Sequence, residues 1–150
     1  MLSGSTVQTV RKSQVGELEG AIGSAGIERR WRELTACSGD AALQALSACQ
    51  ILDRAAAGDP MAQQIVVRIS DHLATVCSYL SLILNCSLIV LGGELGVHPV
   101  LLQATSARLE GHDFAHPRLA ITQLGVKAEL QGAMCLALNA AETSLPLLDA

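Results

Sequence analysis

Apolar residues recur every three or four positions through the middle of the chain. Seven of them form one series: Met61, Ile65, Ile69, Leu73, Val76, Leu80 and Leu84. This spacing places them on one face of an α-helix. Just before the series, Gly58 suits the left-handed residue that ends a helix, Asp59 suits an N-cap, and Pro60 suits the first helical position. The pattern therefore predicts a helix from Pro60 to about Asn85.

The N-terminal part of the chain also shows helical patterns, and glycines interrupt them. Residues 16–34 predict two short helices, broken near Gly23 and Gly26. The sequence Ser38-Gly39-Asp40 is suited to cap the next helix, which covers about residues 41–57. Residues 1–15 are polar with weak β character, which predicts a frayed end or an edge strand.

After the long helix, the pattern changes to that of short buried strands. Leu88-Ile89-Val90-Leu91 is a continuous apolar run, typical of a strand buried on both faces in a parallel sheet. Further along, the pattern predicts a helix from His98 to about Glu110, a second strand at Leu119–Gln123 and a final helix at Val126–Glu142. Helices between strands indicate parallel pairing with right-handed crossovers. The prediction is a helix-rich α/β fold with short parallel strands.

One uncharged stretch raises the question of a membrane span. Leu73 to Gly93 carries no charged side chain and is long enough to cross a bilayer. Polar residues interrupt the stretch, and its pattern changes from helical spacing to a short β-type run. A buried helix followed by a buried strand is therefore favoured over a membrane span.

The composition favours a single domain with an aliphatic core. The chain has 150 residues, of which 50% are apolar and only 2% aromatic. Its net charge of -4 disfavours a surface for nucleic acid, which requires clustered Lys and Arg. The one basic cluster is Arg29, Arg30 and Arg32, and Glu28 and Glu33 lie at the helical spacing that would neutralise it. A solvated, self-paired helix face is favoured.

The cysteines and histidines give no metal motif. No two of the 5 cysteines are spaced as CxxC or CxC, so a structural zinc site is not expected. An odd number of thiols without a secretion signal favours a reducing cytoplasm. His112 and His116 flank Asp113, but Gly111 and Pro117 place them in a loop, and a surface loop is favoured over a metal site.

Three short motifs are candidates for ligand contact, and for each the residues alone favour a structural role. Gly92-Gly93 allows either close backbone approach to a ligand or tight strand-to-helix packing. Glu19 can accept hydrogen bonds from sugar hydroxyls or serve as a solvated acid at a helix start. Gly125, with the small Ala128 and Gly132, favours close packing of the last helix on the sheet.

Taken in order, four segments resemble the ROK family of sugar kinases and sugar-responsive repressors. Gly16-Glu17-Leu18-Glu19, followed by Ala21-Ile22-Gly23-Ser24, resembles the segment after the zinc-binding cysteines of that family. Residues 56–62 (AAGDPMA) resemble its helix break, and residues 88–93 (LIVLGG) resemble its strand and glycine turn. Residues 124–138 resemble its final helix. The resemblance covers about residues 16–142. Each segment alone is a modest match, and it is their order along the chain that is specific for the family.

The resemblance implies an actin-like, ribonuclease H-like ATPase fold. It implies that Glu19 contacts a sugar hydroxyl and that Gly92 and Gly93 line the nucleotide side of a cleft. It assigns no catalytic residue and no metal ligand to this chain, because the catalytic Asp and the zinc ligands of the family lie in segments that have no counterpart here. ATP and zinc are expected only in full-length kinase relatives.

Three glutamates depart from the kinase pattern. Glu17 stands where the last zinc-binding cysteine would be, Glu94 stands where the kinases usually have a third glycine, and Glu129 replaces a small residue. A carboxylate at about 4 Å from a nucleotide phosphate costs a few kcal/mol at an effective dielectric constant of about 20. These departures favour the regulator branch of the family.

Residues 1–150 are therefore interpreted as one truncated ROK C-terminal domain, with residues 1–15 and 143–150 loose. The predicted function is that of a sugar-sensing effector domain of a transcriptional regulator, located in the cytoplasm and inactive as a kinase alone. The alternative is the C-terminal half of an ATP-dependent hexose kinase that needs a missing N-terminal half. A third hypothesis is a packing or oligomerisation fragment without a ligand.

The partners expected are a second copy of the chain and a sugar. Leu80, Leu82, Ile83 and Leu84 lie on more than one helical face, so one core cannot easily cover them all. A symmetric dimer through the long helix or the N-terminal segment is the commonest way to bury such a surface. Direct contact of this segment with nucleic acid or a membrane is not expected.

Overall fold

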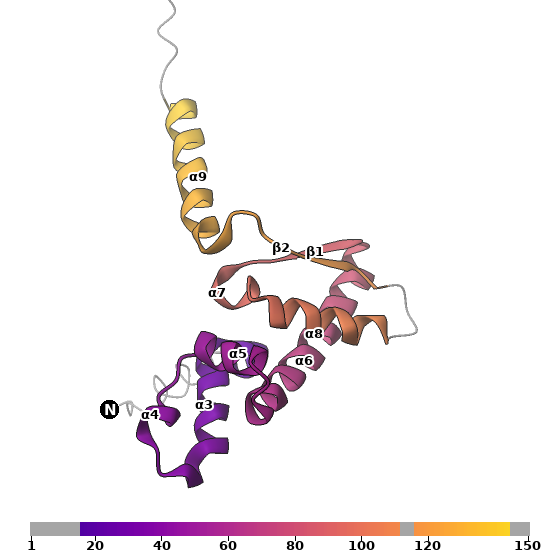
Figure 1. Cartoon of the computed structure of the whole chain (residues 1–150). Coiled ribbons are helices and arrows are strands. Elements are labelled where there is room, and N and C mark those ends of the chain that lie inside the picture. The colour runs from indigo at the N-terminus through magenta and orange to yellow at the C-terminus, as the bar shows by residue number, and fades with distance from the viewer. Residues whose placement is uncertain (1–15, 112–115, 145–150) are drawn as a thin grey trace, which may run out of the picture.

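Helices lie against one face of a two-stranded sheet, and a last helix projects from the body (Figure 1). The structure is a computed structural model and describes residues 16–111 and 116–144. Its elements are α2 (Glu17–Ile22), α3 (Ser24–Thr35), the 3-10 turn η1 (Ala36–Ser38), α4 (Ala41–Gln44), α5 (Ala48–Ala56), α6 (Pro60–Leu84), β1 (Leu88–Leu91), α7 (Gly93–Gly96), α8 (Pro99–Glu110), β2 (Arg118–Ile121), the 3-10 turn η2 (Gly125–Lys127) and α9 (Ala128–Ser144). The predicted order from Pro60 onward is confirmed, with the short α7 in addition.

The corner between α5 and α6 has the predicted conformation. Gly58 lies in the left-handed region with φ 92°. The Asp59 carboxylate accepts hydrogen bonds from the backbone N–H groups of Met61 at 2.9 Å and Ala62 at 3.2 Å. Pro60 occupies the first turn of α6, where its missing N–H leaves no partner unsatisfied. The three residues therefore end one helix and begin the next.

The main core lies between α3, α5, α6 and α8. Trp31 of α3 is fully buried, and its Nε1–H donates to the Leu43 carbonyl at 2.6 Å. The Arg54 guanidinium of α5 lies 5.6 Å from the centroid of the Trp31 ring. Aliphatic side chains complete this core: Ile27, Ile51, Leu52, Ile65, Val66, Ile69 and Leu101. The predicted aliphatic core is present, with the single tryptophan at its centre.

The two strands pair in parallel, as predicted. The register runs from Leu88 opposite Arg118 to Leu91 opposite Ile121. Ile89 and Leu119 pack on a second, smaller core formed by Ala74, Cys77 and Leu109. The strands and the helices α6 and α8 therefore form a two-layer α/β arrangement.

The prediction that β1 is buried on both faces is wrong for the described residues. Its burial alternates, and Leu88 and Val90 keep 45% and 55% of their surface exposed. The described helices that pack on β1 cover only the face that carries Ile89. The sequence pattern of β1 is that of a strand buried on both faces, but its face with Leu88 and Val90 is exposed among the described residues.

The predicted helix over residues 41–57 is in fact two helices. The short α4 ends at Gln44, and α5 begins at Ala48 with a capping box. The Ser47 hydroxyl accepts from the Gln50 N–H at 3.4 Å, and the Gln50 side chain accepts from the Ser47 N–H at 2.9 Å. A Ser followed three residues later by Gln is a known helix-start signal, and it accounts for this boundary inside the single helix that was predicted. Farther upstream, the chain breaks at Gly23 alone, and Gly26 lies inside α3.

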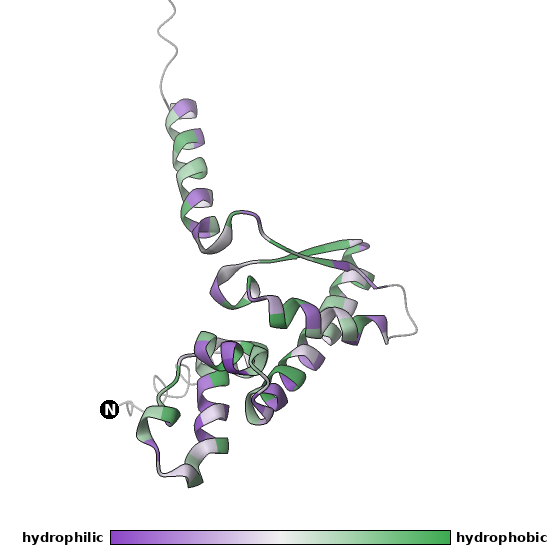
Figure 2. Cartoon of the chain, viewed as in Figure 1, coloured by the Kyte–Doolittle hydropathy of each residue, from purple (hydrophilic) through white to green (hydrophobic). Residues whose placement is uncertain are grey.

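Helix α9 does not pack on the sheet, contrary to prediction. It projects away from the body (Figure 1), and an added Cβ at Gly132 would meet nothing within 4 Å. Apolar residues occur along it and along the end of α6 (Figure 2). Those most exposed are Tyr79, Leu82, Ile83, Leu84, Leu130, Met134, Leu136 and Leu138. The uncharged stretch from Leu73 to Gly93, which was expected to be buried, is therefore covered only in its first half.

Helix α6 is, among the described residues, long and apolar enough to cross a membrane by length and composition. This is weak evidence for a membrane span, because the core helix of a soluble protein passes the same test. Its first half contributes Ile65, Val66 and Ile69 to the main core. That packing favours the interpretation of α6 as a core helix.

The cap at Asp59 generates a prediction about stability. Burial tends to raise the pKa of the Asp59 carboxyl, but the hydrogen bonds from Arg54, Ala62 and Met61 and the charge of Arg54 outweigh it and hold the pKa below its usual value. A lowered pKa stabilises the fold above the unfolded-state pKa, and this stabilisation is lost as the pH falls through the folded-state pKa. Asp59→Ala is expected to lower the free energy of unfolding by about 1–2 kcal/mol at neutral pH. The difference from the unmodified chain should shrink below about pH 4.

Chemical denaturation monitored by circular dichroism across pH measures this effect. Asp40→Ala is the matched control, because Asp40 also accepts from two backbone N–H groups but caps only the four residues of α4. Its effect is expected to be smaller. Equal losses in the two variants, or a pH-independent loss at Asp59, would contradict the role assigned to the corner.

Candidate functional site

A pocket of about 490 Å³ brings together the residues singled out in the sequence. Glu19 lies on its α2 side, and Gly92 and Gly93 lie at the turn after β1. Glu94 of α7 and Glu129 of α9 also line it. Three segments that are far apart in the sequence therefore line one cavity.

Glu19 is placed by the tight turn between α2 and α3. The Gly23 N–H donates to the Glu19 carbonyl at 2.8 Å and ends α2. A Cβ added to Gly23 would lie 2.3 Å from Glu19 Oε1 and 2.7 Å from the Glu19 carbonyl oxygen. The Glu19 carboxylate therefore folds over Gly23, and only glycine leaves room for it there.

The two glycines of the turn after β1 differ in backbone conformation. Gly93 has φ 74°, a left-handed conformation that side chains rarely adopt. Gly92 is the N-cap of α7 with an extended backbone, and an added Cβ there would meet only Thr122 Cγ2, at 3.6 Å. Backbone conformation explains Gly93, whereas neither conformation nor close packing explains Gly92. A ligand-contact role for both glycines stays a prediction.

The pocket is acidic. It is lined by three glutamates, and no lysine, arginine or histidine is found among the described residues around it. Burial and a hydrogen bond with Glu94 raise the pKa of the Cys49 thiol of α5, and the charges of Glu94 and Asp53 act in the same direction. Cys49 is therefore a protonated thiol at neutral pH, next to the acidic rim.

This arrangement suits hydroxyl donors better than phosphates. Carboxylate oxygens accept hydrogen bonds, and the glycine turn leaves backbone groups accessible at the end of a parallel strand. A phosphate among three carboxylates would be repelled, since no described basic side chain in the lining offsets them. No group of three or more His, Cys, Asp and Glu side chains in the described segments is placed to hold a metal ion.

Other residues considered in the sequence lie elsewhere. His116 is exposed, while His112 and Asp113 lie outside the described residues. His98 is the N-cap of α8, and its Nε2 lies 3.2 Å from Asp53 Oδ1, a pairing with no obvious signal in the sequence. His72, expected to be partly buried, is half-buried on α6.

With this geometry in view, comparison with known proteins gives the family. The sequence matches the ROK family over residues 14–140. The chain is a member of the ROK family. No curated protein sequence matches it.

Two solved structures show the same fold in ROK proteins. One is a ROK family glucokinase from Streptomyces griseus in complex with glucose and AMPPNP, with a TM-score of 0.63 and 22% identity. The other is a ROK family protein from Streptococcus pneumoniae TIGR4 in complex with sucrose, with a TM-score of 0.67 and 19% identity. The matches cover 81% and 84% of this chain but only 44% of each of those chains.

These similarities establish the fold class. The chain is a helix-rich α/β member of the ROK family, whose sugar kinases have an actin-like ATPase fold. It spans less than half the length of the two solved ROK proteins. The resemblance inferred from the sequence is confirmed at the level of the family.

The contact between Glu19 and Gly23 generates a second stability prediction. Gly23→Ala would drive a methyl group into the Glu19 side chain and carbonyl, so we expect a loss of about 1–3 kcal/mol. Gly20→Ala is the matched control, because Gly20 lies in α2 and an added Cβ meets nothing within 4 Å. This control should stabilise the chain by up to about 1 kcal/mol. Urea denaturation of the two variants measures both effects, and a neutral Gly23→Ala would contradict the packing.

Proposed function

We propose that this chain is the sugar-binding, effector-type part of a ROK transcriptional regulator and does not act as a kinase alone. The observation that carries this proposal is the acidic pocket. Glu19, Glu94 and Glu129 line it without a basic residue among the described ones. A neutral polyhydroxylated ligand fits these carboxylates, whereas the negatively charged phosphates of a nucleoside triphosphate do not.

Glu19 is the residue proposed to contact the sugar. Its carboxylate lies over Gly23 at the wall of the pocket. A carboxylate that accepts a hydroxyl hydrogen bond forms a charge-assisted contact, stronger than one between neutral groups. The solved ROK protein of Streptococcus pneumoniae TIGR4 is in complex with sucrose, which supports a sugar as the ligand class.

Glu94 separates this proposal from the kinase alternative. It follows the glycine turn directly, and its carboxylate contributes, after burial, to the raised pKa of the Cys49 thiol of α5. The glucokinase of Streptomyces griseus is in complex with AMPPNP, and a nucleotide phosphate at the equivalent turn here would approach the Glu94 carboxylate. The alternative remains that this chain is half of a hexose kinase. It is favoured by one observation, the 44% coverage of the solved glucokinase.

The proposal also gives the location and the partners. We propose a cytoplasmic protein that needs neither ATP nor zinc in this segment. In a regulator of this kind, the contact with DNA would belong to another segment. The open face of β1 and the exposed helix α9 are proposed to be covered by further polypeptide, either a second copy or the rest of a ROK fold.

The sugar site can be tested with a panel of neutral hexoses and disaccharides in ligand-observed NMR. We expect weak binding, with Kd on the order of 1 mM, and about tenfold weaker binding in Glu19→Gln, because one charge-assisted hydrogen bond is lost. Glu110→Gln is the control, since Glu110 is exposed at the end of α8 and outside the pocket lining. A coupled assay should find no ATP turnover with any of the sugars.

The outcomes separate the hypotheses. Sugar-dependent ATP turnover by the purified chain at ordinary kinase rates would refute the regulator proposal. Turnover that appears only after adding a polypeptide with the N-terminal half of a ROK kinase would support the alternative. Absence of sugar binding at tens of millimolar would refute the sugar-binding proposal. If turnover also failed to appear after the N-terminal half was added, a packing role would be left.

The exposed apolar surface generates a prediction of self-association. Leu82 and Ile83 keep 61% and 77% of their surface exposed near the end of α6. Light scattering at micromolar concentration is expected to give twice the 15.6 kDa chain mass. Replacing both residues with Glu should yield a monomer, whereas Val67→Glu, at an exposed position on the first half of α6, should not. A monomer without any substitution would contradict the proposal.

A further inference from the structure

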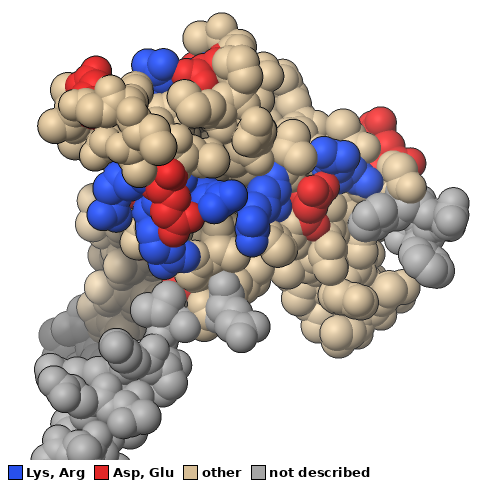
Figure 3. All heavy atoms as spheres, turned by 90° about the horizontal axis from the view of Figure 1, so that it is seen from below, with Lys and Arg blue, Asp and Glu red and all other residues tan. Residues whose placement is uncertain are grey.

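A second hollow, on another face of the helical layer, has the opposite charge. This groove has a volume of about 680 Å³ and lies between α2, α3 and α6. Seen from below the view of Figure 1, a band of basic side chains with a few acidic ones crosses this face (Figure 3). Arg29 and Arg30 of α3 and Arg68 of α6 line the groove, with Glu33 as its one acidic lining residue.

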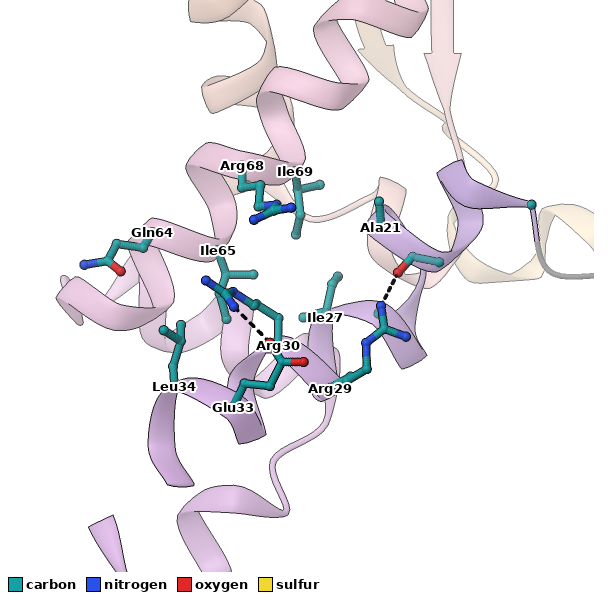
Figure 4. A pocket seen from close by; sticks show the side chains of 13 residues that line it. Ala21, Ile27, Arg29, Arg30, Glu33, Leu34, Gln64, Ile65, Arg68 and Ile69 are labelled. Carbon is teal, nitrogen blue, oxygen red and sulfur yellow. Dashed lines mark hydrogen bonds and ion pairs between the residues drawn. The ribbon is translucent and has the colours of Figure 1, made fainter. Parts of the chain in front are cut away.

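The three arginines meet the groove in different ways (Figure 4). Arg29 Nη2 donates to the Gly20 carbonyl at 2.9 Å, which fixes the side chain across the end of α2. Arg30 pairs with Glu33 at 2.9 Å, and both side chains are about half exposed. Arg68 reaches from α6 toward α3 and has no ion-pair partner among the described residues. The lining therefore carries an excess of two positive charges on a chain whose net charge is -4.

The prediction of a self-paired arginine cluster holds only in part. Arg30 pairs with Glu33, but the Glu28 carboxylate accepts from the Ala48 N–H at 3.2 Å and forms no ion pair with Arg32. Arg32 instead donates to the Glu28 carbonyl. Of the two acids expected to neutralise the cluster, only Glu33 forms an ion pair with one of its arginines. Arg68 joins the cluster from α6, which the spacing within α3 could not indicate.

The floor of the groove is apolar. Ile27 and Leu34 of α3 and Ile65 and Ile69 of α6 line it beneath the arginines. Ile27, Ile65 and Ile69 are core residues, so the floor is rigid. A cavity of this size with an apolar floor and a few convergent polar groups has the character of a small-molecule site.

The N-terminal segment of the chain is a poor occupant by charge. Residues 1–15 contain Arg11 and Lys12 and no Asp or Glu. A segment of that composition would add positive charge beside the arginines. The charge of the groove therefore calls for an anion from outside the chain.

We propose that the groove binds a small phosphate monoester with an apolar body. The dianionic phosphate would sit between Arg29, Arg30 and Arg68, since guanidinium groups bind phosphate oxygens in paired hydrogen bonds. The apolar body would lie on Ile65 and Ile69. This site is separate from the acidic pocket and does not depend on the function proposed for it.

Phenyl phosphate is the probe, titrated into the full chain by isothermal calorimetry at low ionic strength. We expect saturable binding that weakens with added salt, and weaker binding of inorganic phosphate, which lacks the apolar body. The double variant Arg29→Gln, Arg68→Gln is expected to bind about tenfold more weakly or worse. Arg32→Gln, on the same helix but outside the groove lining, should change the affinity less than about twofold.

The remaining outcomes would overturn the proposal. Phenol binding as tightly as phenyl phosphate would mean that the arginines take no part. A hexaglutamate peptide that binds while phenyl phosphate does not would make the groove a docking surface for acidic protein segments. Equal weakening in Arg32→Gln, or no saturation by 10 mM probe, would also contradict it. Glu19→Gln should leave this binding unchanged, and circular dichroism checks that each variant is folded.

Discussion

The contact between Arg54, Asp59 and Trp31 sets the positions of the other helices. Asp59 starts α6 by accepting two backbone N–H bonds and pairs with Arg54 at 2.6 Å. Arg54 in turn lies over the ring of Trp31, which is fully buried and bonded to Leu43. One short corner therefore joins α3, α5 and α6, and the apolar faces of these helices close on one another around it. Without this corner, α6 would lose both its start and its alignment on the core.

Both cavities adjoin α6, the helix that begins at this corner. It fixes the first half of α6 against α3, and α2 then folds back beside α6 through the break at Gly23. Ile69 of α6 lines both the acidic pocket and the basic groove. The second half of α6 has no such partner on its outer side, and there Leu82 and Ile83 are exposed. A well-packed helical layer thus ends in an open α/β layer, which is consistent with a chain that spans 44% of the solved ROK proteins.

Local signals in the sequence predicted local structure well, because caps and turns depend on neighbouring residues. Gly58, Asp59 and Pro60 took the predicted positions, and the parallel pairing of the strands followed from their order along the chain. Burial was predicted less well, because an apolar segment is buried only where another element of the structure packs on it. Val90 looks like a core residue in the sequence, yet 55% of its surface is exposed. The pocket was predicted only as separate residues. Arg68 could not be placed in a groove from the sequence, since the other arginines that line it lie on α3.

Helix α2 connects the two cavities physically. Four of its residues divide by face: Gly20 and Ala21 line the basic groove, whereas Glu19 and Ile22 line the acidic pocket. Arg29 holds the groove side through the Gly20 carbonyl, and Gly23 leaves room for the Glu19 carboxylate on the pocket side. A helix of six residues has little stability of its own, so these tertiary contacts decide its position. Most of the charge of each cavity comes from other elements: Glu94 of α7 and Glu129 of α9 join Glu19 in the acidic pocket, whereas α3 and α6 supply the arginines of the groove. Helix α2 therefore forms a shared wall, with a carboxylate on the pocket side and only backbone and small side chains on the groove side.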